Sequence, residues 1–436
     1  MSLSNILIFI VPGIIIILFL LILLTIRILF NPAYYSHAGN SRLEKGLYSE
    51  ALEYFYKALK KNTKTYGENS LEVAECKVNL ANVLIFKNRD NEAFELLTSA
   101  LKIINVINPD HNSITASIYN YMGVIYSKRD KHNNAIEYFN KFMDIAKKES
   151  LNPASIASVY NNIAQVYFKL EQPEKAIETH NKALELYENI HGNNHISMAN
   201  TYNQLAMAYE KHGDFNKSLE CLNNAHKIIT CLYGQQHPDV AAIYNNSATV
   251  LYRQNKTDEA LELLKKAIEI YEKVYGLEDI NTANLYSTTA IVFNSKGLYE
   301  EALKYFNSAL YTYENYYGQN NTTTATTYSN IASTYKNMGN IEKSLEFYNM
   351  ALNIYENIFG HEHSNTGYIY YSISNVYLEN KEFDKAQNNI LKAYEIILNV
   401  FGERHTKTKQ LCNDIAYLYE QNNNSEEASK WTAKAI

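Results

Sequence analysis

Asparagine side chains recur in register along this chain of 436 residues, and their spacing is the first feature that suggests chemistry. Each lies 41 residues, 42 residues or a multiple of 42 from another member of the set. A side-chain amide both donates and accepts hydrogen bonds, so a row of amides could bind the backbone of an extended peptide. The members of this asparagine row are Asn120, Asn161, Asn162, Asn203, Asn245, Asn246, Asn330 and Asn413.

Two interpretations of the asparagine row stay open. Asparagine is frequent throughout the sequence, so these residues could be solvated side chains that reflect composition alone. Their common register favours a peptide-binding surface instead. The sequence does not decide between the two.

Residues that could catalyse a reaction or hold a metal ion form no known pattern. The sequence contains no phosphate-binding loop, nucleophile elbow or zinc-protease motif, and its four cysteines lie far apart without a C-x-x-C pair. Four histidines recur at multiples of 42 residues, but this spacing favours a role at the start of successive helices over a shared metal. We therefore expect no catalytic, cofactor-binding or metal-binding residues. The recurring histidines are His195, His237, His363 and His405.

Composition narrows the class of protein further. Apolar residues make up 46% of the chain, with only 15 Gly and 6 Pro, so we expect a folded protein. The 46 Asp and Glu outnumber the 40 Lys and Arg, which gives a net charge of −6. A nucleic-acid-binding protein is normally basic, so we expect no nucleic-acid partner.

A repeating unit of 42 residues must position the asparagine row. Glycines recur every 42 residues, and a second column of small residues keeps the same spacing with a single step of 41. Ten units are present by this count. The glycine column consists of Gly192, Gly234, Gly276, Gly318, Gly360 and Gly402. The small-residue column consists of Gly39, Ala81, Gly123, Ala164, Ala206, Ala248, Ala290, Ala332, Ser374 and Ala416.

Each unit is predicted to form two helices. In the fifth unit, Tyr202, Leu205 and Tyr209 share one helical face with the small residue Ala206, and a second apolar stripe begins at Ser218. The glycine column would end the second helices. The asparagine row falls on the first helices, outside their apolar faces. These patterns predict an all-α solenoid of about ten helix-turn-helix repeats.

This pattern of small, aromatic and glycine positions resembles the tetratricopeptide repeat, and its 42-residue period resembles the kinesin-light-chain subtype. The resemblance covers residues 33–436. It implies a right-handed α-solenoid whose first helices line a groove, and Asn rows bind cargo peptides in that subtype. A kinesin light chain would carry a coiled coil ahead of its repeats, which is missing here. The Lys and Arg with which chaperone-tail binders of this family grip a terminal carboxylate are also missing from the first helices.

The N-terminal end is predicted to be a membrane anchor. Ile6–Ile26 contains no charged residue, and the apolar run continues after Arg27 to Phe30. As a helix this stretch would span ~37 Å, against about 30 Å for the hydrocarbon core of a bilayer. It is too long for a signal peptide and lacks a basic segment before it. We predict that residues 1–5 form a tail and residues 6–30 a single transmembrane helix.

The charges around this segment predict its orientation. No Lys or Arg precedes it, whereas several follow within the next 40 residues, so the repeats are expected on the cytoplasmic side. Six N-x-S/T triplets occur, as an Asn-rich sequence produces by chance. Their asparagines are Asn216, Asn245, Asn255, Asn320, Asn321 and Asn423.

The C-terminal end lacks a polar capping helix after the tenth unit, although solenoids usually need one. We expect an apolar face there that could pair with a second copy of the chain or with a partner. For the whole protein, we expect a membrane-anchored scaffold that binds protein or peptide partners in its groove. The alternative is an accessory or regulatory subunit of a membrane-associated enzyme or transport complex that binds a folded partner.

Overall fold

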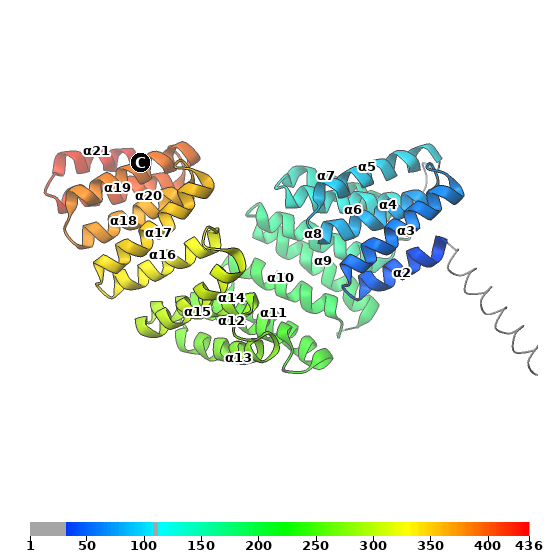
Figure 1. Ribbon diagram of the computed structural model, residues 1–436, viewed down its shortest axis with the longest axis horizontal. Helices are drawn as coiled ribbons and strands as arrows, with labels where there is room; N and C mark the ends of the chain where they lie inside the picture. Colours follow the sequence, from blue (N-terminus) through cyan, green and yellow to red (C-terminus); the bar gives the residue numbers. More distant parts are fainter. Residues whose placement is uncertain (1–31, 108–111, 193, 436) are drawn as a thin grey trace, which may run out of the picture. The chain divides into compact units, whose positions relative to one another are not determined.

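The computed structural model describes residues 32–107, 112–192 and 194–435, and all regular secondary structure in these ranges is helical (Figure 1). The twenty described helices form ten helix-turn-helix pairs, which confirms the all-α class and the number of repeats. The right-handed sense of the solenoid stays a prediction.

The helices group into two compact units that divide between Gly213 and Asp214. In unit 1, the first helices of the repeats are α2 (Pro32–Glu44), α4 (Leu71–Phe86), α6 (Asn112–Lys128), α8 (Pro153–Lys169) and α10 (Ile196–His212). The second helices are α3 (Tyr48–Tyr66), α5 (Asp90–Ile107), α7 (His132–Lys148) and α9 (Pro173–His191).

Unit 2 begins with the second helix of the fifth repeat and holds five further repeats. Its first helices are α12 (Pro238–Arg253), α14 (Ile280–Ser295), α16 (Thr322–Asn337), α18 (Ser364–Glu379) and α20 (Thr406–Gln421). Its second helices are α11 (Phe215–Tyr233), α13 (Thr257–Tyr275), α15 (Tyr299–Tyr317), α17 (Ile341–Phe359), α19 (Phe383–Phe401) and α21 (Ser425–Ala435). Within each unit every helix packs against the next one in the chain.

The small-residue column allows the two helices of a repeat to approach closely. A Cβ atom added to Gly123 of α6 would lie 2.5 Å from the Phe139 ring of α7, and one added to Gly39 would lie 2.6 Å from the Phe55 ring. Both rings are fully buried. A larger side chain at either glycine would therefore collide with the core of its repeat.

Each junction between repeats in unit 2 combines a glycine that ends one helix with a side chain that caps the next. Gly234 ends α11 with φ of 85°, a conformation that costs glycine little. The His237 Nδ1 then accepts a hydrogen bond from the backbone N–H of Asp239 at 3.2 Å, and its ring stacks on Tyr233 with 4.5 Å between centroids. At the next three junctions a tyrosine of the following first helix donates to a glutamate of the preceding second helix, as Tyr370 does to Glu356 at 2.9 Å.

The recurring histidines are therefore N-caps, which confirms their expected role at the start of helices. All four accept a backbone hydrogen bond through Nδ1. Asp279 and Asn321 take the same place at the other two junctions of unit 2. No group of three or more His, Cys, Asp or Glu side chains that could hold a metal ion occurs in the described ranges.

The predicted membrane anchor, residues 6–30, lies outside the described residues and stays a prediction. None of the helices that the structure describes is both long and apolar enough to cross a membrane.

The C-terminal pair differs from its expected form. Trp431 of α21 is only 8% exposed and packs edge-on against Tyr394 at 4.8 Å. Of the large hydrophobic side chains in the described parts of α20 and α21, only Tyr417 is exposed. Pairing with a second copy thus lacks the broad apolar face on which its prediction rested, and it stays untested.

Candidate functional site

In unit 1 the asparagine row bonds to itself and to the core. The Asn162 Nδ2 on α8 donates to the Asn120 Oδ1 on α6 at 3.1 Å, so two members from successive repeats lie side by side. Both are half-buried, as is Asn203 on α10. The structure thus brings part of the row into one line of amides across the first helices.

Asn161 has a partner at each end of its amide. Its Nδ2 donates to the Thr201 Oγ1 at 2.7 Å, and its Oδ1 lies 2.9 Å from the His180 Nδ1. His180 is 1% exposed and stands in the core column that holds Phe139 and Leu222 in the neighbouring repeats. Because an amide oxygen only accepts, the ring donates to Asn161. Burial lowers the pKa of His180 to about 4, so the ring is neutral at pH 7.

This arrangement was not predicted, although the sequence holds a signal for it. A histidine in a column of Phe and Leu needs a polar partner inside the core. Asn161 lies on the helix that pairs with the His180 helix. Its amide therefore serves the core of the fourth repeat, whatever it contributes to a groove.

In unit 2 the members of the row differ from those in unit 1. The Asn245 Oδ1 on α12 is buried and has no hydrogen-bond partner among the described residues. Asn246 and Asn330 are half-buried, and Asn413 on α20 is exposed. A buried carbonyl oxygen without a partner costs free energy unless a ligand or water supplies a donor.

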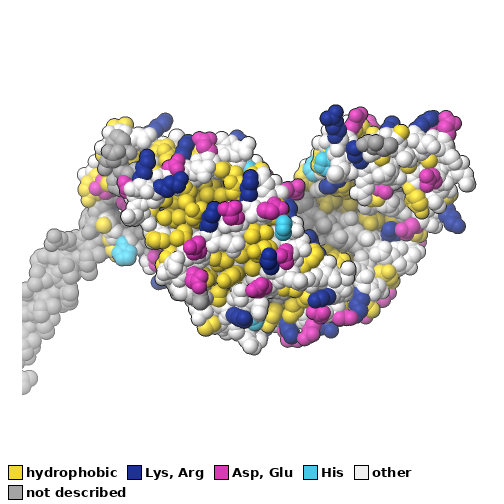
Figure 2. Space-filling model, turned by 180° about the vertical axis from the view of Figure 1, so that it is seen from behind, with side chains coloured by type: hydrophobic (Ala, Val, Ile, Leu, Met, Phe, Trp, Pro, Cys, Tyr) yellow, Lys and Arg dark blue, Asp and Glu magenta, His cyan; other side chains and the backbone are white. Residues whose placement is uncertain are grey.

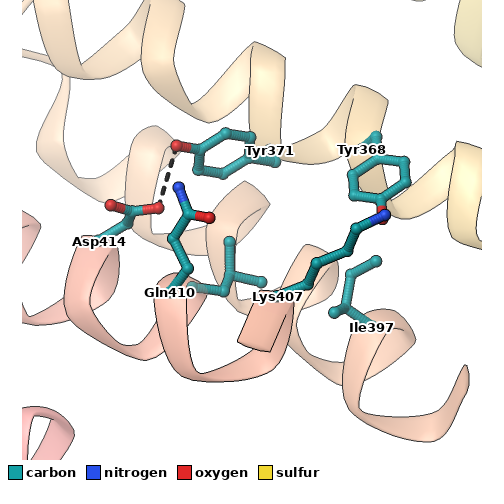
Figure 3. A pocket seen from close by; sticks show the side chains of 7 residues that line it. Tyr368, Tyr371, Ile397, Lys407, Gln410 and Asp414 are labelled. Carbon is teal, nitrogen blue, oxygen red and sulfur yellow. Dashed lines mark hydrogen bonds between the residues drawn. The ribbon is translucent and has the colours of Figure 1, made fainter. Parts of the chain in front are cut away.

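A cavity of unit 2 lies between α18 and α20 (Figure 3). Its volume is about 160 Å³. Tyr368 and Tyr371 of α18 form one side, and the buried side chains of Ile397 and Leu411 supply apolar surface. The lining residues are Tyr368, Tyr371, Ile397, Lys407, Gln410, Leu411 and Asp414. We call this the α18–α20 cavity.

The two ends of the α18–α20 cavity carry opposite charges. At one end the Tyr371 hydroxyl donates to the Asp414 Oδ2 at 3.0 Å. At the other, the Lys407 Nζ donates to the Tyr368 hydroxyl at 2.5 Å. Figure 3 shows the Gln410 amide standing between these pairs. A ligand here would meet a carboxylate, an amide, an ammonium group and two aromatic rings.

Burial perturbs the titration of the Asp414 end. It raises the pKa of the Asp414 carboxyl group, with the hydrogen bond from Tyr371 acting in the opposite sense. Burial also raises the pKa of Tyr371, so its hydroxyl keeps its proton at neutral pH. Asp414 forms no ion pair with any Lys or Arg in the described part of the chain. The carboxylate is partly desolvated and lacks a countercharge.

A second hollow of about 480 Å³ follows along the same helices, toward their C-terminal ends. Lys336 of α16 and Glu379 of α18 form an ion pair there at 2.9 Å. The other lining residues are Asn375, Leu378, Lys381, Phe383, Tyr417 and Gln421. Both hollows therefore lie along the first helices, on which the sequence predicted a groove.

Sequence reasoning did not single out the α18–α20 cavity. Its residues interrupt the asparagine row, because Tyr371 stands 42 residues before Asn413, in the column that holds Asn203 and Asn245. The departure from the row was the available signal. The partner residues come from three helices, so the sequence alone did not group them.

The repeats, their paired helices and their small-residue contacts define an α-solenoid of helix-turn-helix repeats. The family model of the tetratricopeptide repeat matches most of the chain, and the protein belongs to this family. The matched residues are 32–105, 79–148, 155–230, 197–273, 239–315, 281–357 and 323–397. No curated protein matches the sequence.

Solved structures share the fold at low sequence identity. The apo form of the quorum sensor NprR from B. thuringiensis is 15% identical, with a TM-score of 0.60 over 83% of this chain and 97% of that one. A Rap protein solved in complex with Competence and Sporulation Factor is 16% identical, with a TM-score of 0.54 over 84% and 97% of the two chains.

A putative kinesin light chain from Podosopora anserina is 18% identical, with a TM-score of 0.43 over 48% of this chain and 98% of that one. A TM-score this low supports no assignment to a subtype. The kinesin-light-chain resemblance therefore stays a prediction.

Proposed function

We propose that the protein is a scaffold that binds an extended peptide segment of a partner on the first helices of unit 2. The observation that carries this proposal is the α18–α20 cavity. Residues facing each other from two successive first helices leave a space there instead of closing against one another. Polar groups and aromatic rings around an apolar surface are typical of a binding site.

One further observation supports a peptide ligand. The unpartnered Asn245 Oδ1 on the same set of helices could accept a backbone N–H of a peptide. The Rap protein of similar fold was solved with a bound factor, and NprR is described as a quorum sensor. At 15–16% identity these proteins support the fold alone, so the ligand class rests on the cavity.

Selection from a displayed library of random 15-residue peptides tests this function. The bait is the full chain in detergent, beside Gln410→Trp, which places an indole in the cavity. The matched control is Asn388→Trp on an exposed position of α19 outside the cavity lining. We expect peptides that bind the wild type and the control but not Gln410→Trp. Equal binding to all three, or no enriched peptide, would contradict the proposal.

We also propose that residues 6–30 anchor the scaffold in a membrane with its repeats in the cytoplasm. The apolar length and the Lys and Arg that follow it support this proposal. Translation with microsomes provides the test, because Asn216 and Asn255 are exposed N-x-S/T asparagines. We expect membrane-bound, unglycosylated protein that protease added outside the microsomes degrades. Glycosylation of either asparagine would reverse the orientation.

The second candidate is an accessory subunit that binds a folded partner. Hydrophobic side chains reach the surface between charged ones (Figure 2). In unit 2, one such set recurs where the second helices end. Its exposed members are Leu232, Tyr233, Val274, Tyr275, Tyr316, Tyr317, Ile358, Phe359 and Val400. Tyr316 is 67% exposed. The substitution Tyr316→Ser should weaken the binding of a folded partner, while the peptides selected from the library still bind.

A further inference from the structure

The Asp414 end of the α18–α20 cavity has an unusual balance of groups. The Asp414 Oδ2 accepts a hydrogen bond from Tyr371 at 3.0 Å, but this neutral hydroxyl brings no countercharge. The carboxylate is half-buried and forms no ion pair with a described Lys or Arg. A partly desolvated carboxylate gains most from a cation that reaches it with hydrogen bonds.

The walls of the cavity suit a cation on a long apolar stem. Ile397 and Leu411 are 2% and 6% exposed and offer apolar surface to methylene groups. Tyr371 and Tyr368 present aromatic rings beside this surface (Figure 3). Guanidinium groups stack on such rings and bind carboxylates in a planar, two-pronged geometry, whereas an ammonium group acts as a point charge. This combination favours arginine over lysine.

Lys407 is the cation that could oppose such a ligand. It precedes Asp414 by seven residues in α20, which places the two Cα atoms about 10 Å apart along the helix. Its Nζ bonds the Tyr368 hydroxyl and lies 4.8 Å from the Tyr368 ring centroid and 5.3 Å from that of Phe401. Its ammonium group is thus held against Tyr368, at the other end of the cavity from Asp414.

We propose that the α18–α20 cavity binds a basic side chain, preferably arginine, of an extended peptide segment, and that Asp414 pairs with its charge. This inference rests on the proposed peptide-binding function and names the residue type that the site selects. Gln410 lies between Asp414 and Lys407, where its amide can bond the peptide backbone beside the anchored residue.

The test uses peptides enriched on the wild-type full chain by the library selection described above. We expect one position in these peptides to hold Arg or Lys. A synthetic peptide with Arg at that position is then compared with its citrulline version, which keeps the shape and removes the charge. On the wild type, citrulline should weaken binding about 10- to 100-fold.

The same pair of peptides is measured on Asp414→Asn and on the charge-matched control Asp384→Asn, an exposed carboxylate of α19 outside the cavity lining. Asp414→Asn should bind both peptides equally, whereas the control should discriminate like the wild type. Circular dichroism melts check that both variants fold, and Asp414→Glu offers a second variant that retains the charge.

The outcomes separate the two proposals. Enriched peptides without a basic position, or a citrulline effect that persists in Asp414→Asn, would overturn the arginine site and leave peptide binding intact. If no peptide is enriched on the wild type, the peptide-binding function itself fails, and the arginine site fails with it.

Discussion

The polar side chains on the first helices serve different purposes in the two units. In unit 1, Asn161 bonds both His180 and Thr201, and Asn162 bonds Asn120. In unit 2, Asn245 leaves a buried oxygen without a described partner, and Asp414 lacks a countercharge. The comparison teaches that a regular row of amides does not mark a binding site by itself. The positions with unmet hydrogen-bonding or charge requirements are better candidates.

The largest expected effect is an acid sensitivity confined to the His180 region. Burial lowers its pKa to about 4 in the folded protein, from about 6.5 for a solvated histidine. Stability from the neutral ring is therefore complete above pH 6.5 and is lost as pH falls toward 4, by about 3 kcal/mol. Urea unfolding and the hydrogen exchange of α9, each at pH 7 and pH 4, measure this loss of stability. His180→Leu should remove the pH dependence of hydrogen exchange in α9 and leave exchange in α13 unchanged. If this variant lost as much stability between pH 7 and pH 4 as the wild type does, His180 would not be the cause.

The next effect compares two substitutions in the asparagine row. Asn161→Ala should destabilise the protein by about 2 kcal/mol, because it leaves the buried His180 ring without its acceptor. Asn245→Ala removes no described hydrogen bond of the Oδ1 atom and should change stability by less than about 0.5 kcal/mol. Urea midpoints provide the measurement. Adding His180→Leu should restore most of the loss from Asn161→Ala, and similar losses in both alanine variants would erase the difference between the units.

A smaller effect is expected in the pH dependence of peptide binding to unit 2. Because burial raises the pKa of Asp414, its carboxylate takes up a proton at a higher pH than usual. The affinity for an arginine peptide should therefore fall as pH drops through that raised pKa, by about tenfold at full protonation. Lys407, Tyr368 and Tyr371 also face the cavity, and burial raises the pKa of Tyr371 away from this range. Peptide affinities measured by fluorescence anisotropy should not fall at low pH for Asp414→Asn. An equal fall in affinity for this variant would mean that another group titrates.

The smallest effect concerns the junctions between repeats. His363→Ala removes the acceptor for the Asn365 N–H and the ring that stacks on Phe359 at 4.1 Å. We expect this variant to lose about 1 kcal/mol of helix stability, which is measured as faster hydrogen exchange at the start of α18. His363→Asn keeps a capping side chain, as Asn321 does at an earlier junction, and should lose less. Equal exchange in both variants would mean that the cap contributes nothing.

The repeat architecture could be predicted from the sequence because its signals are local and recur ten times. The glycine, small-residue and histidine columns each correspond to a contact that recurs in several repeats, as the Gly123 contact with Phe139 recurs between Gly39 and Phe55. The cavity could not be predicted in this way, since it depends on side chains that break the pattern. Tyr371 and Asp414 lie 43 residues apart and meet only because α18 and α20 are neighbours. The partners of Asn161 were missed because they lie on two other helices.

The junctions also bear on how such a chain can change in length. Each one from Gly234 onward has a glycine and, three residues later, a polar side chain that caps the next helix, and this pair returns every 42 residues. Deleting or duplicating one whole unit between two of these glycines would join a helix end to the same kind of cap. Recombination within the gene could thus add or remove repeats without requiring a new kind of contact between neighbouring repeats. The last two repeats, whose first helices enclose the α18–α20 cavity, would be carried along unchanged.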